Sequence, residues 1–150
     1  MLVSNEAASE LRDLLFSFLG LFHEKFIYRF RKSNESHSEM KKNHIKIISF
    51  LYRDDSLTST EIAKMLDLEK GSVTTLIDQL AELGLVSRCA APHDRRKSLL
   101  VLTDLGRSEM EDIIGNELKV INEMFHNHKT DDIQDFVNSL RHVIEFLNKL

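Results

Sequence analysis

Residues 57–68 read LTSTEIAKMLDL and predict a short, well-capped helix. Thr58 and Glu61 form a capping box, because the Thr58 hydroxyl can accept from the Glu61 amide while the Glu61 carboxylate reaches back to Thr58. The helix ends near residues 67–68. Its buried face consists of the apolar residues Ile62, Ala63 and Leu66.

Residues 69–85 continue EKGSVTTLIDQLAELGL and predict a second helix almost at once. This helix begins near Glu69 and stops at Gly84, which suits a left-handed C-cap, with Leu85 placed for the accompanying apolar contact. Two helices joined by a turn of a few residues form a helix-turn-helix arrangement. The inward positions of the second helix are Val73, Leu76, Ile77, Leu80 and Leu83.

Residues 86–106, VSRCAAPHDRRKSLLVLTDLG, predict a β-hairpin followed by a helix. We expect strands at 86–90 and 98–102 with a polar tip at 92–97. Thr103 and Asp104 then cap a long helix, Asp104 lying at the positive end of its dipole. A hairpin directly after the second helix of the motif is a wing.

The two ends of the chain predict long amphipathic helices. Apolar residues recur at threes and fours over 5–32, and between Leu14 and Phe22 they occupy every side, so this segment must be covered. A polar connection at 31–43 leads to a helix that ends near Arg53, and a last helix begins near Asp131. The terminal helices are expected to pack together across a dimer, the alternative being an intramolecular core.

The fold expected from these patterns is mainly α with a small β wing. The 150 residues form one domain, with a winged-helix part at about 40–103 and dimerisation helices at about 5–32 and 104–150. One cysteine gives no disulfide framework, no signal peptide is visible, and the longest uncharged run is far below the roughly 20 residues of a membrane span. We therefore expect a cytoplasmic protein without a membrane association. No catalytic motif or phosphate-cradling glycine loop occurs, so no enzyme and no cofactor are expected.

The formal net charge of −4 argues, taken alone, against a protein held to nucleic acid by bulk charge. The distribution of the charge reverses that argument. Residues 104–150 contain 10 acidic and 5 basic residues, which leaves +1 for the first 103 residues. Residues 86–100 alone carry +3. An acidic tail and a small basic edge are the pattern expected of a DNA-binding wing joined to a dimerisation segment.

The segment 57–106 resembles the MarR family of bacterial and archaeal transcriptional regulators. The resemblance implies a winged-helix DNA-binding domain in an obligate dimer, most often a repressor, which binds a pseudo-palindromic site in double-stranded DNA. In such proteins the second helix of the motif, the recognition helix, enters the major groove and the wing reaches a minor groove. The resemblance is carried by Leu57-Thr58, Glu61-Ile62-Ala63, Val73-Thr74, Leu80, Gly84-Leu85-Val86-Ser87-Arg88, Asp94-Arg95-Arg96 and Leu102-Thr103-Asp104-Leu105-Gly106.

The outward face of the recognition helix carries short polar side chains. Hydroxyls can contact phosphates or bases, and a glutamine can read adenine; the alternative is an ordinary solvated face. Many relatives carry Ser or Thr at Glu69 and Arg at positions 75 and 79, so this helix is less basic than usual. Affinity should therefore depend on the wing, on Lys64 and Lys70, and on a cluster of Lys41, Lys42 and Lys46. The candidate DNA-binding residues of this helix are Lys70, Ser72, Thr74, Thr75 and Gln79.

The candidate wing residues are Asp94, Arg95, Arg96 and Lys97. Three like charges at a hairpin tip repel one another unless an anion offsets them. The resemblance makes Arg96 the minor-groove arginine, oriented by a salt bridge from Asp94, and a narrow A·T groove attracts such a guanidinium. The alternative is a solvated turn held by Asp94.

Family members often release DNA when a small aromatic molecule binds between the dimerisation helices and the winged part. Such an effector pocket would be lined by Phe and Ile, with His23, Tyr28 or His44 as polar anchors. Cys89 is the only thiol and lies within the predicted wing strand, where it is expected to be an inert strand residue; a redox-sensing regulator is one alternative function. A protein-interaction module without DNA binding is another. His126 and His128 project in different directions on a helix, so no metal site is expected.

Overall fold

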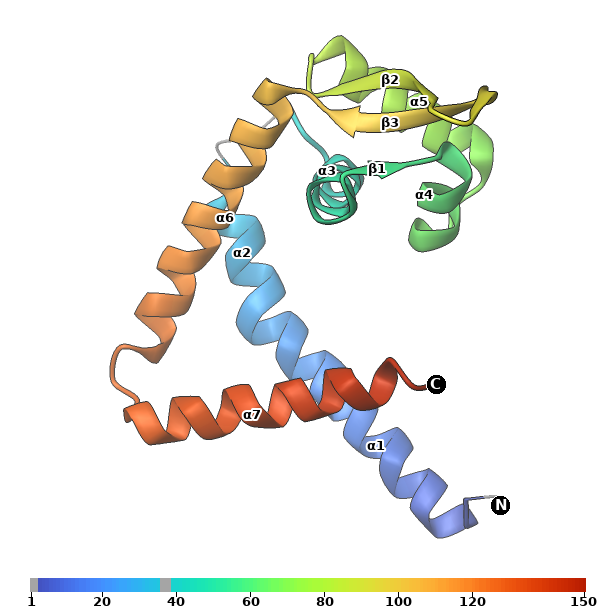
Figure 1. Cartoon of the computed structure of the whole chain (residues 1–150). Helices are drawn as coiled ribbons and strands as arrows, with labels where there is room; N and C mark the ends of the chain where they lie inside the picture. Colours follow the sequence, from blue (N-terminus) through green and yellow to red (C-terminus); the bar gives the residue numbers. More distant parts are fainter. Residues whose placement is uncertain (1–2, 36–38) are drawn as a thin grey trace.

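The computed structural model describes residues 3–35 and 39–150, except for the side chains of Arg95 and Arg96. In Figure 1 the winged part lies at one end of α6, and α7 folds back from the other end across the N-terminal helix. The elements are α1 Asn5–Phe22, a π-helical turn His23–Ile27, α2 Tyr28–Ser33, α3 Lys42–Asp54, β1 Ser56–Leu57, α4 Ser59–Leu66, α5 Lys70–Glu82, β2 Val86–Ala91, β3 Asp94–Leu102, α6 Asp104–Phe125 and α7 Thr130–Leu147. The architecture is mainly α with a small β wing, as the sequence predicts.

The N-terminal helix is continuous from α1 through the π turn into α2. Ser4 begins it as an N-cap whose hydroxyl accepts from the Ala7 amide at 3.2 Å. At the other end, Asn34 is buried, and its carboxamide oxygen accepts from Asn116 of α6 at 3.2 Å. The end of α2 is therefore fixed to the middle of α6.

The helix-turn-helix has the local caps that the sequence predicts. Glu61 accepts from the Thr58 amide at 2.7 Å, and its own amide donates to the Thr58 hydroxyl at 3.2 Å. Asp67 turns the chain in the left-handed region with a φ of 53°, and Gly84 ends α5 with a φ of 75°. Glu69 is the N-cap of α5 but makes no side-chain hydrogen bond to that helix.

The sheet is antiparallel with strand order β1-β3-β2. The two-residue strand β1 was not predicted from the sequence; it pairs through Ser56 and Leu57 with the far end of β3. The wing strands are also longer than predicted. Ala91 pairs with Asp94 past an irregularity at 90–91, so positions 95–97 lie in β3 and the turn is Pro92-His93. The polar residues predict a loop over 92–97, whereas the structure closes the tip with the pair Ala91–Asp94 and leaves residues 95–97 as a bulge in β3 between this pair and Ala90–Ser98.

The core lies in the winged part and is formed by side chains of α3, α4, α5, the wing strands and the first half of α6. In contrast, α1 and α7 contain no buried residue in this single chain. Their apolar side chains are instead exposed, as Leu14 at 61% and Ile144 at 57% show. The fully buried side chains are Ile47, Ile48, Leu51, Ile62, Val73, Ile77, Leu80, Leu100 and Ile113.

Candidate nucleic-acid interface

The recognition helix α5 divides into a buried and an exposed face. Val73, Ile77 and Leu80 point into the core, while Lys70, Ser72, Thr74 and Thr75 are exposed. The Thr74 hydroxyl donates to the Lys70 carbonyl at 2.9 Å, and the Thr75 hydroxyl donates to the Gly71 carbonyl at 3.2 Å. These bonds use the hydroxyl hydrogens, so both oxygens are left as acceptors and both methyl groups remain on the outer surface.

Gln79, the remaining candidate of this helix, is half-buried and bonded inward. Its oxygen lies 2.8 Å from Nε2 of His44, whose ring is only 2% exposed between α3 and α5. His44 was expected in an effector pocket, but it is a core residue of the winged part. The sequence gives no direct signal for this contact, because the two residues are 35 positions apart.

An ion pair that the sequence analysis did not predict joins α5 to the wing. Arg88 of β2 donates to Asp78 of α5 at 2.7 Å. Both side chains are about half exposed, so the pair adds little stability. It neutralises Arg88, one of the four basic residues at 86–100, and it ties β2 to α5.

A polar groove of about 550 Å³ lies between the start of α4, the start of α5 and β3. Lys70 and Lys97 contribute its two positive charges, and Thr58, Ser59, Thr60, Glu61 and Ser98 supply the remaining polar lining. The Thr58 amide and hydroxyl, and then the charge of Lys97, lower the pKa of Glu61 below its ordinary value. The groove brings together one predicted residue of the recognition helix and one of the wing.

The wing candidates lie on β3. Asp94 is half-buried and Lys97 is exposed. The backbones of Arg95 and Arg96 belong to the strand, but their side chains lie outside the described residues, and so does the expected salt bridge between Asp94 and Arg96. Cys89 is exposed on β2, opposite Leu99.

A second site is an apolar pocket of about 660 Å³ between the N-terminal helix, α6 and α7. Stacked or tilted rings form much of its wall: Phe22 and Phe26 have centroids 5.5 Å apart, and Phe125 lies 6.3 Å from Phe26 and 6.0 Å from Phe136. Lys25 and Asn122 are its polar lining residues. The predicted anchors His23, Tyr28 and His44 do not line this pocket.

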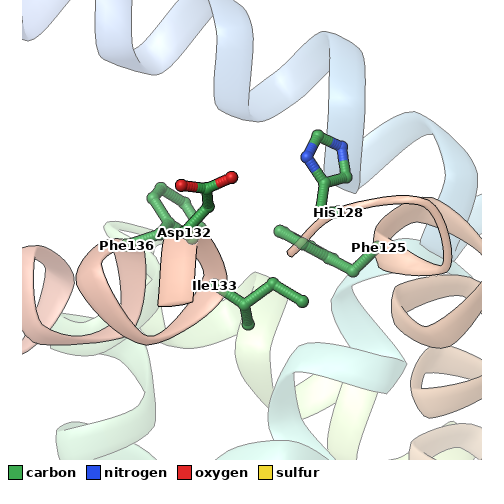
Figure 2. Close-up of a pocket in the computed structure, with 5 residues that line it drawn as sticks. All are labelled: Phe125, His128, Asp132, Ile133 and Phe136. Carbon is green, nitrogen blue, oxygen red and sulfur yellow. The ribbon is translucent and has the colours of Figure 1, made fainter. Parts of the chain in front are cut away.

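A smaller pocket of about 240 Å³ lies at the elbow between α6 and α7. Figure 2 shows the imidazole of His128 and the carboxylate of Asp132 beside Phe125, Ile133 and Phe136. Three of these residues, Phe125, Ile133 and Phe136, also line the larger pocket, so the two spaces are neighbours. Among the described residues, no group of three or more His, Cys, Asp or Glu side chains could hold a metal ion. Within the same ranges, no helix is long and apolar enough to cross a bilayer.

Comparisons with known proteins point to one family. A sequence model of the MarR family matches residues 38–97. The chain is 30% identical over 111 residues to the HTH-type transcriptional repressor YetL of Bacillus subtilis (strain 168). The aligned region covers 73% of this chain and 66% of that protein.

Solved structures share the fold over nearly the whole chain. A MarR family protein from Bacillus stearothermophilus superposes with a TM-score of 0.78 at 18% identity, covering 98% of this chain and 99% of that one. A mutant of S. aureus MepR bound to an oligodeoxyribonucleotide superposes with a TM-score of 0.63 at 19% identity, covering 89% of this chain and 97% of that one. At these sequence identities the superpositions establish the shared fold alone. That fold includes the terminal helices as well as the winged part.

Proposed function

Because the chain belongs to the MarR family of transcriptional regulators, which are not enzymes, we propose that it is a homodimeric repressor released from its operator by a small aromatic effector. Its operator is a pseudo-palindromic site in double-stranded DNA. The observation that carries the proposal is the groove in which Lys70 of the recognition helix and Lys97 of the wing lie together. The similarity to YetL, a named repressor, supports the direction of regulation.

The DNA contacts are proposed as follows. Thr74 and Thr75 face the major groove with acceptor oxygens and methyl groups, which suit a cytosine amine and a thymine methyl group. Ser72 lies on the same exposed face. Lys70 and Lys97 contact phosphates, which position the protein without reading sequence. Asp94, Arg95 and Arg96 act at the wing, with Arg96 in the minor groove.

Exposed apolar surface supports the homodimer. Leu14, Phe18 and Leu19 on α1 and Val143 and Ile144 on α7 are all 44% exposed or more in one chain. Monomeric proteins rarely expose contiguous apolar patches of this kind. A second copy of the same two helices would cover them through an isologous interface.

The aromatic-walled pocket supports the effector. Its volume of about 660 Å³ lies in the range of small-molecule sites. Phenylalanine rings favour an aromatic ligand. The Lys25 ammonium pairs with the exposed Glu24 at 2.6 Å, and a carboxylate on the ligand would take the place of that partner. The proposed effector class is therefore a small aromatic acid.

The DNA-binding proposal is tested by selecting bound fragments from random DNA and titrating the selected site in a mobility-shift assay. We expect enrichment of a two-fold symmetric sequence, and Arg96→Ala should weaken binding strongly without changing the melting temperature. Arg53→Ala is the matched control, because it removes an exposed arginine that is paired with Asp54. Failure to enrich any sequence would instead favour the protein-interaction module, and unchanged binding by Arg96→Ala would refute the wing assignment.

The dimer and the effector have separate tests. Sedimentation should show a dimer that Leu14→Glu converts to a monomer, whereas Met65→Glu, a change at an exposed position on α4, should leave it intact. Benzoate or salicylate should dissociate the operator complex more effectively than cyclohexanecarboxylate. Equal effects of all three acids, or none, would contradict the aromatic effector.

A further inference from the structure

His44 is a buried polar residue in contact with the recognition helix. Its ring is 2% exposed, and both of its nitrogens have hydrogen-bond partners. One partner is the backbone amide of Lys41 at the start of α3, and the other is the side chain of Gln79 on α5. The imidazole therefore links the first turn of one helix to the third turn of the other.

The partners determine which nitrogen of His44 carries the proton. The Lys41 amide can only donate, so Nδ1 at 3.1 Å must accept with its lone pair. In a neutral imidazole the hydrogen is then on Nε2. Nε2–H donates to the Gln79 oxygen at 2.8 Å, since the reverse orientation of the carboxamide would bring two donors face to face.

The position of Gln79 makes this orientation relevant to DNA. Residues 72, 75 and 79 follow one another at spacings of three and four, so Gln79 lies on the same stripe of α5 as the exposed Ser72 and Thr75. Gln79 itself is half-buried. Its oxygen is directed into the interface between α3 and α5, where a base edge cannot approach, and its amide nitrogen is left for the outer surface.

We propose that His44 sets the hydrogen-bonding polarity of Gln79, so that Gln79 presents only amide donors to DNA and favours guanine at the base pair it faces. This inference rests on the proposed DNA-binding function. Bidentate reading of adenine needs a carboxamide that accepts from N6 and donates to N7, whereas guanine offers two acceptors, O6 and N7. The preference thus differs from the adenine reading expected from the sequence, and His44 is a positioning residue that determines specificity.

The test compares bound-fragment selections for the wild-type protein and for variants at Gln79. The wild type should prefer guanine at one base pair in each half-site, by about fivefold to tenfold over adenine for one such contact. Gln79→Ala should remove that preference. Gln79→Glu keeps an acceptor for His44 but turns the outward donor into an acceptor, so the preference should change to cytosine, whose N4 amine donates.

Variants at His44 test the positioning role. His44→Gln can still donate to the Gln79 oxygen and should keep the guanine preference. His44→Leu removes the donor and frees the Gln79 oxygen, so adenine should gain at that base pair. Ile48→Val is the control, because it loosens the core on the same helix but removes neither hydrogen bond of His44, and it should leave the selected sequence unchanged. Melting curves for all variants separate loss of fold from loss of specificity.

Distinct outcomes identify which proposal fails. If the wild type enriches no sequence, the proposed DNA-binding function itself fails. If the wild type enriches a site but Gln79→Ala lowers affinity equally for all sequences, Gln79 contacts a phosphate and the present inference is overturned. It is also overturned if Gln79→Glu retains guanine, or if His44→Leu folds and selects the wild-type sequence.

Discussion

Replacement of Gly106 by alanine should destabilise the protein, because the added methyl group would push the backbone before the wing away from α6. Gly106 is buried in the first turn of α6, where the Leu85 backbone passes directly over it. The approach is fixed by three hydrogen bonds around Thr103. The Thr103 amide donates to the Leu85 carbonyl at 3.1 Å, and the Thr103 hydroxyl donates to the Gly84 carbonyl at 2.6 Å. The same hydroxyl oxygen accepts from the Gly106 amide at 3.0 Å.

The geometry gives the size of the effect. A Cβ on Gly106 would lie 2.9 Å from the Leu85 carbonyl carbon and closer still to its oxygen, and 3.2 Å from Cδ2 of Leu102. Non-bonded carbon atoms are most stable about 3.5–4.0 Å apart, so the backbone of Leu85 must move by more than half an ångström. Because the clashing atoms are backbone, no rotamer change relieves them. We expect a loss of about 3 kcal/mol or more, at the upper end for overpacked sites.

The assay is thermal unfolding followed by circular dichroism at matched protein concentration. For a chain of this size, 3 kcal/mol corresponds to a fall in Tm of roughly 6–12 °C. Gly115→Ala in the same helix is the control, since a Cβ there meets no atom within 4 Å. It should stabilise the protein by about 0.5–1 kcal/mol through helix propensity. A Gly106→Ala variant that melts within 1 °C of the wild type would refute the argument.

Three further predictions follow from local contacts and charge. Thr58→Ala should lose about 0.5–2 kcal/mol of unfolding free energy in denaturant titration, whereas Thr58→Ser should retain most of it, because the serine hydroxyl can still cap α4; equal losses would contradict the capping box. Burial raises the pKa of Glu117 above its ordinary 4.5, so the folded protein holds the proton of this carboxyl more tightly than the unfolded chain does. The resulting stability is present at low pH and is lost as the pH rises through the folded pKa. Glu117→Gln should therefore raise Tm at pH 7 but not at pH 4, and an equal gain at both pH values would exclude this cause. Because the recognition helix carries few basic residues, the slope of log affinity against log salt should imply fewer than about ten released ions per subunit, and a steeper slope would refute that view.

The features predicted correctly from the sequence are those set within a few residues. The capping box of Thr58 and Glu61, the helix end at Gly84 and the N-cap at Thr103 each depend on groups three or four positions apart. The wing also followed from local pattern, although its strands extend further toward the tip than the polar residues indicated. The extension comes from one backbone pair, Ala91 with Asp94, beyond a bulge at 95–97, and side-chain polarity gives no sign of such a pair.

The features that were not predicted depend on contacts between elements. The bond from His44 to Gln79 and the ion pair of Arg88 with Asp78 exist only once α3 and β2 pack beside α5. The π turn at 23–27 has a different explanation. Phe18, Phe22, Phe26 and Phe30 recur every four residues, and on a regular α-helix such a series drifts about 40° per step. A wider turn offsets part of this drift and keeps successive rings in contact beside one pocket. The sequence alone does not distinguish this turn from an ordinary helix.

Helix α6 provides the physical connection between the two proposed sites. Its first turn contacts Leu85 at Gly106, its middle is tied to Asn34 through Asn116, and its last residue, Phe125, lines the pocket. Figure 1 shows α6 running from the end of the sheet to the loop before α7. A ligand wedged between Phe26 and Phe125 would tilt α6 against the N-terminal helix. The close contact at Gly106 leaves no room for slippage, so the wing would have to move with α6. In a dimer bound to two half-sites, such a rotation changes the separation of the two recognition helices, and DNA of fixed half-site spacing then binds less tightly. The close contact at Gly106 therefore explains both expectations: an added methyl group destabilises the protein, and a rotation of α6 on effector binding is transmitted to the wing.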